Sequence, residues 1–447
     1  MTGSPIRPAC QRLATRPTGP RYTAKHQAFG ESFVQQVDCV LHARWIAPVE
    51  PAVVWDHHAL VLNGGRIVDC LPSELARSRY QAAHTLTRSS HLVIPGLINT
   101  EVDLASTLWR SQMLTLSSRF SGVPRGIDRQ LLTDSIALGL IEQACAGITS
   151  CVDWGHYSAT VATLAADLGL RVVLGLPVDA SANDYAATLD ECLERSLALH
   201  DEYREHPLIH TAFALHAVPE LSDSVLSRVR VLADQLERVL LLQADATQIR
   251  RLTDLGLWNT PCTLRGWTDP AALPVSSAIS LVHSPAADWQ AGHLPAGISA
   301  PLQSGSNVTL GSGCRPVVRD LLEAMRLTGR QSQLLPSSPL RPAQLLTMAT
   351  LNCARAVGLE DSLGSLSPGK RADCVCVDLN HPATAAVLDP LLALTACAGR
   401  EAVTDVWVAG RPIVVNGRFQ ALDRDDFSAR VRHSLATVLA SNPNVGR

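Results

Sequence analysis

The sequence contains no apolar run that approaches the roughly 18 residues needed to cross a bilayer, so we expect no membrane-spanning segment. It also lacks a strong charge of one sign: the net charge of −3 provides no general attraction for nucleic acid or for an acidic membrane surface. The 12 cysteines form no C-x-x-C pair and no short disulfide framework, which is typical of the reducing cytoplasm. We therefore expect a cytoplasmic protein whose partner is a small molecule or another protein.

The first residues lack acidic side chains altogether. No Asp or Glu precedes Glu31, whereas prolines and arginines are frequent, and few apolar groups are present to offset the entropy lost on ordering. We therefore expect residues 1–36 to be a disordered tail. An Arg-rich, acid-poor start also resembles an organelle transit peptide, and a start codon placed too far upstream would produce the same pattern.

The chain does contain enough apolar sequence for a large core. Its 447 residues are 46% hydrophobic, and this length allows two or three domains. Short strand-like runs with glycine-rich turns occupy 37–91 and return in 363–421, which indicates one small composite β-sandwich formed by both ends of the chain. A C-terminal helix and tail are expected over 422–447.

Between the two β-rich pieces lies alternating strand and helix sequence. Eight strand patterns predict an α/β fold, a (β/α)₈ TIM-like barrel over 92–362 with its functional site at the carboxyl ends of the strands. The candidate strands are 92–98, 149–153, 171–176, 208–216, 238–243, 262–266, 278–283 and 307–311. Helical periodicity is clearest in 134–146, 188–201, 222–239 and 342–357.

The stretch 92–111, LVIPGLINTEVDLASTLWRS, carries both a strand and candidate site residues. An apolar run passes a Pro-Gly turn and delivers Asn99, Glu101 and Asp103 at its carboxyl end. Together with AGITSCVD, LVHSPAADW, MATLNCARAVGL and GSLSPGKRADCVCVDL, it closely resembles the amidohydrolase superfamily, in particular the branch of methylthioadenosine/S-adenosylhomocysteine deaminases and chlorohydrolase-like triazine hydrolases. The resemblance covers nearly all of 37–419 and implies the barrel and composite sandwich of that family.

The resemblance also implies a divalent metal, held by two histidines of strand 1, one histidine of strand 5 and an aspartate of strand 8, with a strand-6 histidine on the metal-bound water. Such a metal lowers the pKa of water, so that hydroxide can attack a ring carbon or an amide. The matching positions here are Glu101, Asp103, Leu242 (Gln243 if the register slips by one), Gly266 and Gly313. Because leucine and glycine offer no side-chain donor, we expect the metal site to be lost and no cofactor to be bound.

Other positions of the resemblance keep polar or aromatic residues. Asp245 stands where a proton-shuttling glutamate would be, and it is the candidate catalytic residue. His216 stands where a substrate-contacting histidine would be, and His283 and Trp109 are further candidates for substrate binding. His283 has a simpler interpretation too, as a strand-end histidine that orders a loop.

Two alternatives would preserve catalysis. In the first, Glu101, Asp103 and Asp245 hold one Zn²⁺, Mn²⁺ or Mg²⁺ in a carboxylate-rich site, provided that a nearby cation or water offsets the repulsion between them. In the second, Cys314 or Cys151 acts as a nucleophile without a metal, with a histidine as its base.

We therefore expect an amidohydrolase-fold protein that works by binding a small heteroaromatic molecule, such as a purine nucleoside, or by pairing with an active homologue. The competing hypothesis is a divergent deaminase or amidohydrolase with a rearranged metal site. A third hypothesis is a purely structural role in an assembly, and a homo-oligomer is compatible with all three.

Overall fold

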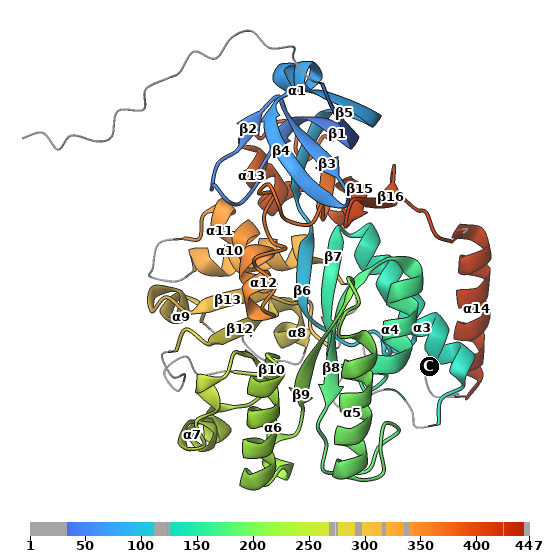
Figure 1. Cartoon of the computed structure of the whole chain (residues 1–447), viewed down its shortest axis with the longest axis vertical. Coiled ribbons are helices and arrows are strands. Elements are labelled where there is room, and N and C mark those ends of the chain that lie inside the picture. The colour runs from blue at the N-terminus through green and yellow to red at the C-terminus, as the bar shows by residue number, and fades with distance from the viewer. Residues whose placement is uncertain are drawn as a thin grey trace, which may run out of the picture.

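The computed structural model describes residues 34–110, 123, 126–267, 273, 276–290, 297–314, 319–334, 339–422 and 424–441. These residues form a parallel barrel and a separate β domain beside one end of it (Figure 1). The first strand, β1 (Gln35–Ile46), begins at the end of the segment predicted to be a tail, and residues 1–33 lie outside the described residues. Within the described ranges, no helix is both long and apolar enough to cross a membrane.

The predicted (β/α)₈ fold is confirmed. Eight parallel strands follow one another in chain order around a nearly closed barrel, with helices on the outside (Figure 1). The strands are β6 (Leu97–Val102), β7 (Ile148–Asp153), β8 (Arg171–Pro177), β9 (Ile209–Leu215), β10 (Leu240–Gln243), β11 (Cys262–Arg265), β12 (Ile279–His283) and β13 (Asn307–Leu310). Seven of the eight strand patterns found in the sequence each correspond to one barrel strand, with differences of a few residues at the ends, and the first pattern, 92–98, overlaps β6 only at its end.

Several helices of the barrel begin at polar caps. The side chains of Asp128, Thr188 and Ser222 accept hydrogen bonds from first-turn amides of α3, α5 and α6, which satisfies donors that a helix start otherwise leaves free. The helices are α3 (Arg129–Cys145), α4 (Ser158–Leu168), α5 (Leu189–Tyr203), α6 (Asp223–Gln235), α7 (Ala246–Asp254), α8 (Pro285–Gln290), α9 (Ser299–Gln303) and α10 (Leu321–Gln333).

The segment 342–357, predicted as one helix, forms two. These are α11 (Pro342–Met348) and α12 (Leu351–Ala356). The break occurs because Thr350 between them has φ −133° and ψ −90°, outside the helical region.

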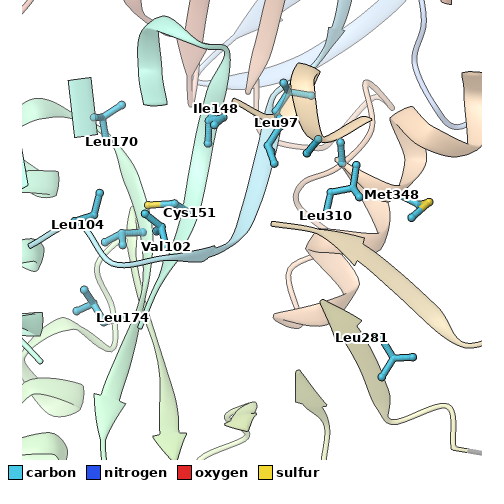
Figure 2. Packing of buried hydrophobic residues seen from close by; sticks show 14 of the residues in the cluster. Leu97, Val102, Leu104, Ile148, Cys151, Leu170, Leu174, Leu281, Leu310 and Met348 are labelled. Atoms are coloured by element: carbon cyan, nitrogen blue, oxygen red, sulfur yellow. The ribbon is translucent and has the colours of Figure 1, made fainter. Parts of the chain in front are cut away.

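The first predicted strand, 92–98, is divided between the two domains at Gly96. Its first part ends β5 (Tyr80–Pro95) of the β domain, and its second part begins β6 of the barrel. Position 96 requires glycine, because a Cβ there would lie 2.0 Å from Oγ1 of Thr149 on β7. This close approach lets Leu97 pair with Ile148, and both side chains join the main hydrophobic core (Figure 2).

The β domain is built from both ends of the chain, as the sequence predicted. Its nine strands form one sheet in the order β17-β16-β15-β14-β5-β1-β3-β4, with β2 paired to β1. Leu41, Leu60, Cys376 and Trp407, which come from both ends of the chain, are buried in one cluster of this domain. The remaining elements are β2 (Trp55–Asp56), β3 (His58–Asn63), β4 (Arg66–Pro72), α1 (Ser73–Arg79), β14 (Cys374–Asp378), α13 (Pro390–Leu392), β15 (Val403–Val408), β16 (Arg411–Val415) and β17 (Arg418–Phe419).

A buried ion pair joins the two domains. The guanidinium of Arg171, at the start of β8, donates to Oδ1 of Asp373 over 3.0 Å, and both side chains are less than 5% exposed. Asp373 immediately precedes β14, and its Oδ1 also accepts from the amide of Ala409 over 2.7 Å. The last helix, α14 (Arg424–Ser441), packs against α3, where Ser434 donates to the buried carboxylate of Asp134.

The seam between the first and last barrel strands is held by side chains. Oγ1 of Thr100 lies 3.0 Å from Oγ1 of Thr309, and Nδ2 of Asn99 donates to Oγ of Ser312 over 2.8 Å. The backbone amide of Ile98 in β6 donates to the carbonyl oxygen of Ala349, between α11 and α12, over 2.9 Å, and not to a carbonyl oxygen of β13. No strand pairing between β6 and β13 occurs among the described residues, so the barrel closes through hydroxyl and amide contacts.

Candidate functional site

Side chains alternate along each barrel strand, and this alternation decides which residues face the mouth. In β10, Leu242 is fully buried in the same cluster as Val229 of α6 and Leu252 of α7, so it points outward toward the helices. Leu241 belongs to a different cluster, made mainly by residues of β7, β8 and β9. Gln243 shares the side of Leu241, and the structure therefore favours the register with Gln243, and not Leu242, at the strand-5 position of the mouth.

The strand β11 follows the same rule. Leu264 is buried in the outer cluster, and Arg265 is the residue that turns to the interior at the strand end. Gly266, the position inferred from the sequence register, comes one residue later and has φ +75°, a conformation that favours glycine. The side chain at the mouth end of the sixth strand is thus an arginine.

The guanidinium of Arg265 contacts side chains from four other strand ends. Its Nη1 lies 3.2 Å from Oε1 of Glu101 and also donates to Sγ of Cys314. Its Nη2 donates to Oε1 of Gln243 over 2.9 Å. The guanidinium carbon lies 4.1 Å from the ring centroid of Trp154, a cation–π contact.

Two buried carboxyl groups, Asp103 and Asp153, face Gly155. A Cβ at position 155 would lie 3.0 Å from Oδ1 of Asp103 and 3.3 Å from Oδ2 of Asp153. Asp153 accepts hydrogen bonds from the amides of Leu104 and Gly155, whereas Oδ1 of Asp103 has no partner among the described residues. Burial, and then the charge of Asp103, raise the pKa of Asp153 to about 7, so this carboxyl group is partly protonated at neutral pH.

A histidine pair lies next to these acids. Nε2 of His156 lies 2.8 Å from Oδ2 of Asp179, and the ring of His216 lies 4.9 Å from that of His156. Burial opposes the charge of His156, but the hydrogen bond and charge of Asp179 outweigh it and raise the pKa of His156. Burial, and then the charges of His156 and Arg265, lower the pKa of His216 to about 3, so His216 is neutral. Its Nε2 is buried without a hydrogen-bond partner among the described residues.

The mouth contains an open hollow of about 310 Å³. Its lining includes His216, Glu220, Gln243, Asp245 and Gly266. The structure therefore brings the predicted residues His216 and Asp245 into one hollow. Gln243, the alternative to Leu242 for the strand-5 position, lies in the same lining.

Asp245 has a structural role in this position. Its Oδ1 accepts hydrogen bonds from the amides of Thr247 and Gln248, over 2.9 and 3.2 Å, and it caps α7. The structure does not join it to Glu101 and Asp103 in a metal-binding group: no three His, Cys, Asp or Glu side chains within the described ranges are placed to hold an ion.

The other two predicted binding residues do not line this hollow. His283 is buried at the end of β12, and burial lowers its pKa to about 4, which keeps it neutral. Trp109, in a short 3₁₀ turn (Thr107–Trp109), is buried in a cluster with Phe427 and Val431 of α14. Both stay sequence predictions of substrate contact.

The two cysteines considered as nucleophiles are protonated thiols. Burial raises the pKa of Cys314 well above its usual range, and burial followed by the charge of Asp153 raises that of Cys151 to about 12. Since the thiolate is the nucleophile, neither side chain is activated in this structure.

Few side-chain donors stand at the positions that the family resemblance assigns to metal ligands. Gly266 and Gly313 provide no side chain, and Leu242 points away from the mouth. Both carboxylate oxygens of Glu101 accept hydrogen bonds from protein groups. Oγ of Ser284 donates to Oε2 over 2.7 Å, and the guanidinium of Arg265 donates to Oε1. Glu101 and Cys314 are thus bound to protein groups, whereas Oδ1 of Asp103 has no partner among the described residues.

Sequence reasoning missed Arg265, Trp154 and Asp179. A signal for Arg265 was available, because a strict alternation from the buried Leu264 puts the next side chain inside the barrel. Asp179 follows the last residue of β8 by two positions, which also predicts a place at the mouth. Nothing in the sequence indicated that Trp154 would stack on an arginine from four strands further along.

Comparison with known proteins gives matches over most of the chain. The model of the Amidohydrolase family matches residues 92–248 and 295–413. The 5-methylthioadenosine/S-adenosylhomocysteine deaminase of Teredinibacter turnerae is 27% identical over 430 residues, which cover 88% of this chain and 96% of that protein. The corresponding deaminase of Saccharophagus degradans is 27% identical over 427 residues, covering 88% and 95%.

Solved structures show the same architecture. An adenosine deaminase from Xanthomonas campestris with bound zinc has a TM-score of 0.86 and 29% identity, and the match covers 91% of this chain and 99% of that one. A variant of atrazine chlorohydrolase from Arthrobacter aurescens, in complex with zinc and atraton, has a TM-score of 0.77 over 89% and 100% of the two chains. At 19% identity the second comparison shows the fold alone.

Proposed function

This chain belongs to the amidohydrolase family, and from that premise we propose that it binds a small heteroaromatic molecule at the barrel mouth without using the family's metal-dependent hydrolysis. The observation that carries the proposal is the set of side chains at the strand ends. Gln243 and Arg265 occupy the mouth ends of β10 and β11, the two strands from which the family resemblance implies a metal ligand and a histidine on the metal-bound water, and Glu101 is bound to Arg265. An amide and a guanidinium are not ligands that hold a catalytic zinc.

The hollow beside these residues suits a flat, polar ring. Its volume of about 310 Å³ lies at the low end of the roughly 300–1,000 Å³ typical of ligand sites. Gln243 and Asp245 offer donor and acceptor atoms along its lining, and the neutral His216 offers a second kind of polar contact. The deaminases in the comparison act on adenine nucleosides according to their names, which suggests nucleosides as the first ligands to test.

Three measurements on one preparation test the proposal: the metal content of protein purified without chelator, ammonia release from adenosine-type and triazine compounds, and the shift of the thermal unfolding midpoint with the same compounds. We expect no stoichiometric metal, no ammonia and a saturable rise of the midpoint with one ligand class. Gln243→Ala should abolish that rise, while Gln235→Ala, at the end of α6, serves as a control that keeps it. Stoichiometric metal with ammonia release would overturn the proposal.

A second candidate is a divergent amidohydrolase, and the buried acid pair favours it. Asp103 has an unpartnered oxygen next to Asp153, an arrangement that can accept and return a proton. For this candidate, ammonia release should vanish in both Asp103→Asn and Asp153→Asn. An equal rate in the wild type and both variants would exclude the pair as the source of the activity.

A further inference from the structure

A single side chain connects the strand ends at the barrel mouth. Arg265 at the end of β11 reaches Glu101 on β6, Gln243 on β10 and Cys314 beyond β13, and it lies over Trp154 beyond β7. A bound metal ion connects strand ends in the same way, by drawing donors from several strands to one positive centre. The guanidinium is nearly enclosed, since its side chain is 12% exposed.

The carboxylate of Glu101 depends on this positive centre. Its side chain is 13% exposed, and its two oxygens contact Arg265 and the hydroxyl of Ser284. A carboxylate at this depth needs a cation or several donors to offset its lost hydration. Two further cations lie nearby: Arg319 donates to the backbone carbonyl oxygen of Asp103 and pairs with the carboxylate of Glu142, and His156 pairs with Asp179.

We infer that Arg265 is the resident cation of the barrel mouth, taking over the electrostatic role of a divalent metal and excluding one from the site. The inference deepens the proposed function, because it names the residue that makes a metal-free mouth stable. It differs from a simple surface ion pair in one consequence: removing the guanidinium should leave the carboxylate of Glu101 and the thiol of Cys314 without their cation, and these two donors should then attract a divalent ion.

A double-mutant cycle tests the charge relationship. Arg265→Met keeps an unbranched apolar stem but removes the charged guanidinium, and we expect the thermal midpoint to fall by about 5 °C or more. Glu101→Gln should lower the midpoint of the wild type but raise that of Arg265→Met, because it removes the uncompensated charge. Additive effects of the two substitutions would overturn the inference. The control is Arg228→Met, which breaks the exposed pair with Asp190 and should shift the midpoint only slightly.

The thermal midpoint of the same variants is also measured with added metal ions. If Arg265 only stabilised the fold, added metal would not change the midpoint of Arg265→Met selectively. Zinc or manganese should raise the midpoint of Arg265→Met and leave the wild type and the charge-preserving Arg265→Lys unchanged. Equal shifts in the wild type and Arg265→Met, or no shift in either, would overturn the inference. Should Arg265→Met fold only with zinc, that result supports it; should it fold under neither condition, Arg265→Gln replaces it in both experiments. If the protein does not bind nucleosides, the proposed ligand is wrong, but the inference about Arg265 is still tested by the double-mutant cycle.

Discussion

Nε2 of His156 lies 2.8 Å from Oδ2 of Asp179, and this pair ties the loop after β7 to the loop after β8. Burial alone would favour neutral groups, yet the hydrogen bond and the mutual attraction raise the pKa of His156 and lower that of Asp179. The two loops therefore meet through an ion pair at the barrel mouth.

Asp179→Asn should lower the pKa of His156, because the remaining amide cannot stabilise the imidazolium. In the wild type, the stabilisation by His156 is complete below its unfolded pKa of about 6.5 and is lost as pH rises through its higher native value. The contribution of Asp179 is present above its unfolded pKa of about 3.9 and is lost as pH falls through its lower native value. NMR titration of the His156 ring in both proteins measures the change. Asp190→Asn, on the outside of α5, is the control that should leave the titration unaltered.

Asp153→Asn should flatten the dependence of stability on pH. The native pKa of about 7 exceeds the unfolded value, so the native state binds more protons and stability falls as pH rises from about 4 to about 7. One proton corresponds to a slope of about 1.4 kcal/mol per pH unit at its steepest. Urea unfolding across this range compares the two proteins. Parallel curves for the wild type and the variant would show that Asp153 ionises normally in the native state.

Asp373→Ala should destabilise the protein by about 3–5 kcal/mol, because it leaves the guanidinium of Arg171 buried without a counter-charge. Asp223→Ala removes an exposed partner of Arg251 and should lower the free energy of unfolding by less than about 1 kcal/mol. Denaturant unfolding gives both values. Similar losses in the two variants would contradict the idea that the domain junction depends on the buried pair.

Leu242→Ala should lower the free energy of unfolding by about 2–5 kcal/mol, since Leu242 fills the core between the barrel and its helices. Gln243→Ala should lower it by less than about 1 kcal/mol, because this side chain is exposed at the mouth. The reverse order of the two losses would place Leu242, and not Gln243, at the mouth.

Asp245→Ala should cost about 1 kcal/mol of stability through loss of the α7 cap, whereas Asp245→Asn should keep most of it, because asparagine also caps helices. If Asp245 carries protons in a reaction, both variants should lose that activity equally. Thermal unfolding and ammonia release, measured side by side, separate the capping role from a catalytic one.

The fold was predictable because its signals are local. Buried strands punctuated by glycine and caps such as Asp128 and Ser222 mark each βα unit in the sequence itself. The division of the first strand at Gly96 was not predictable in this way. It follows from the approach of Thr149 across the domain junction, a contact between residues far apart in the chain.

The site was predictable only in part, because a register error of one residue reverses the side of a strand. Counting along the chain put Gly266 and Leu242 at the mouth, with Gln243 as the alternative to Leu242, whereas alternation in the folded barrel puts Gln243 and Arg265 there. The hollow is lined by both His216 and Asp245, two of the candidates from the sequence. Arg265 contacts Gln243 in the lining of this hollow. This contact joins residues from two strands, so it cannot be predicted from either segment alone.

The closure of the barrel between Thr100 and Thr309 has a consequence for how this chain can diverge. Main-chain ladders survive most substitutions, since every residue but proline supplies the same amide and carbonyl groups. Here the contact between β6 and β13 depends on the side chains at positions 99, 100, 309 and 312. A single substitution can therefore weaken this one contact while the seven hydrogen-bonded strand pairs of the barrel stay intact.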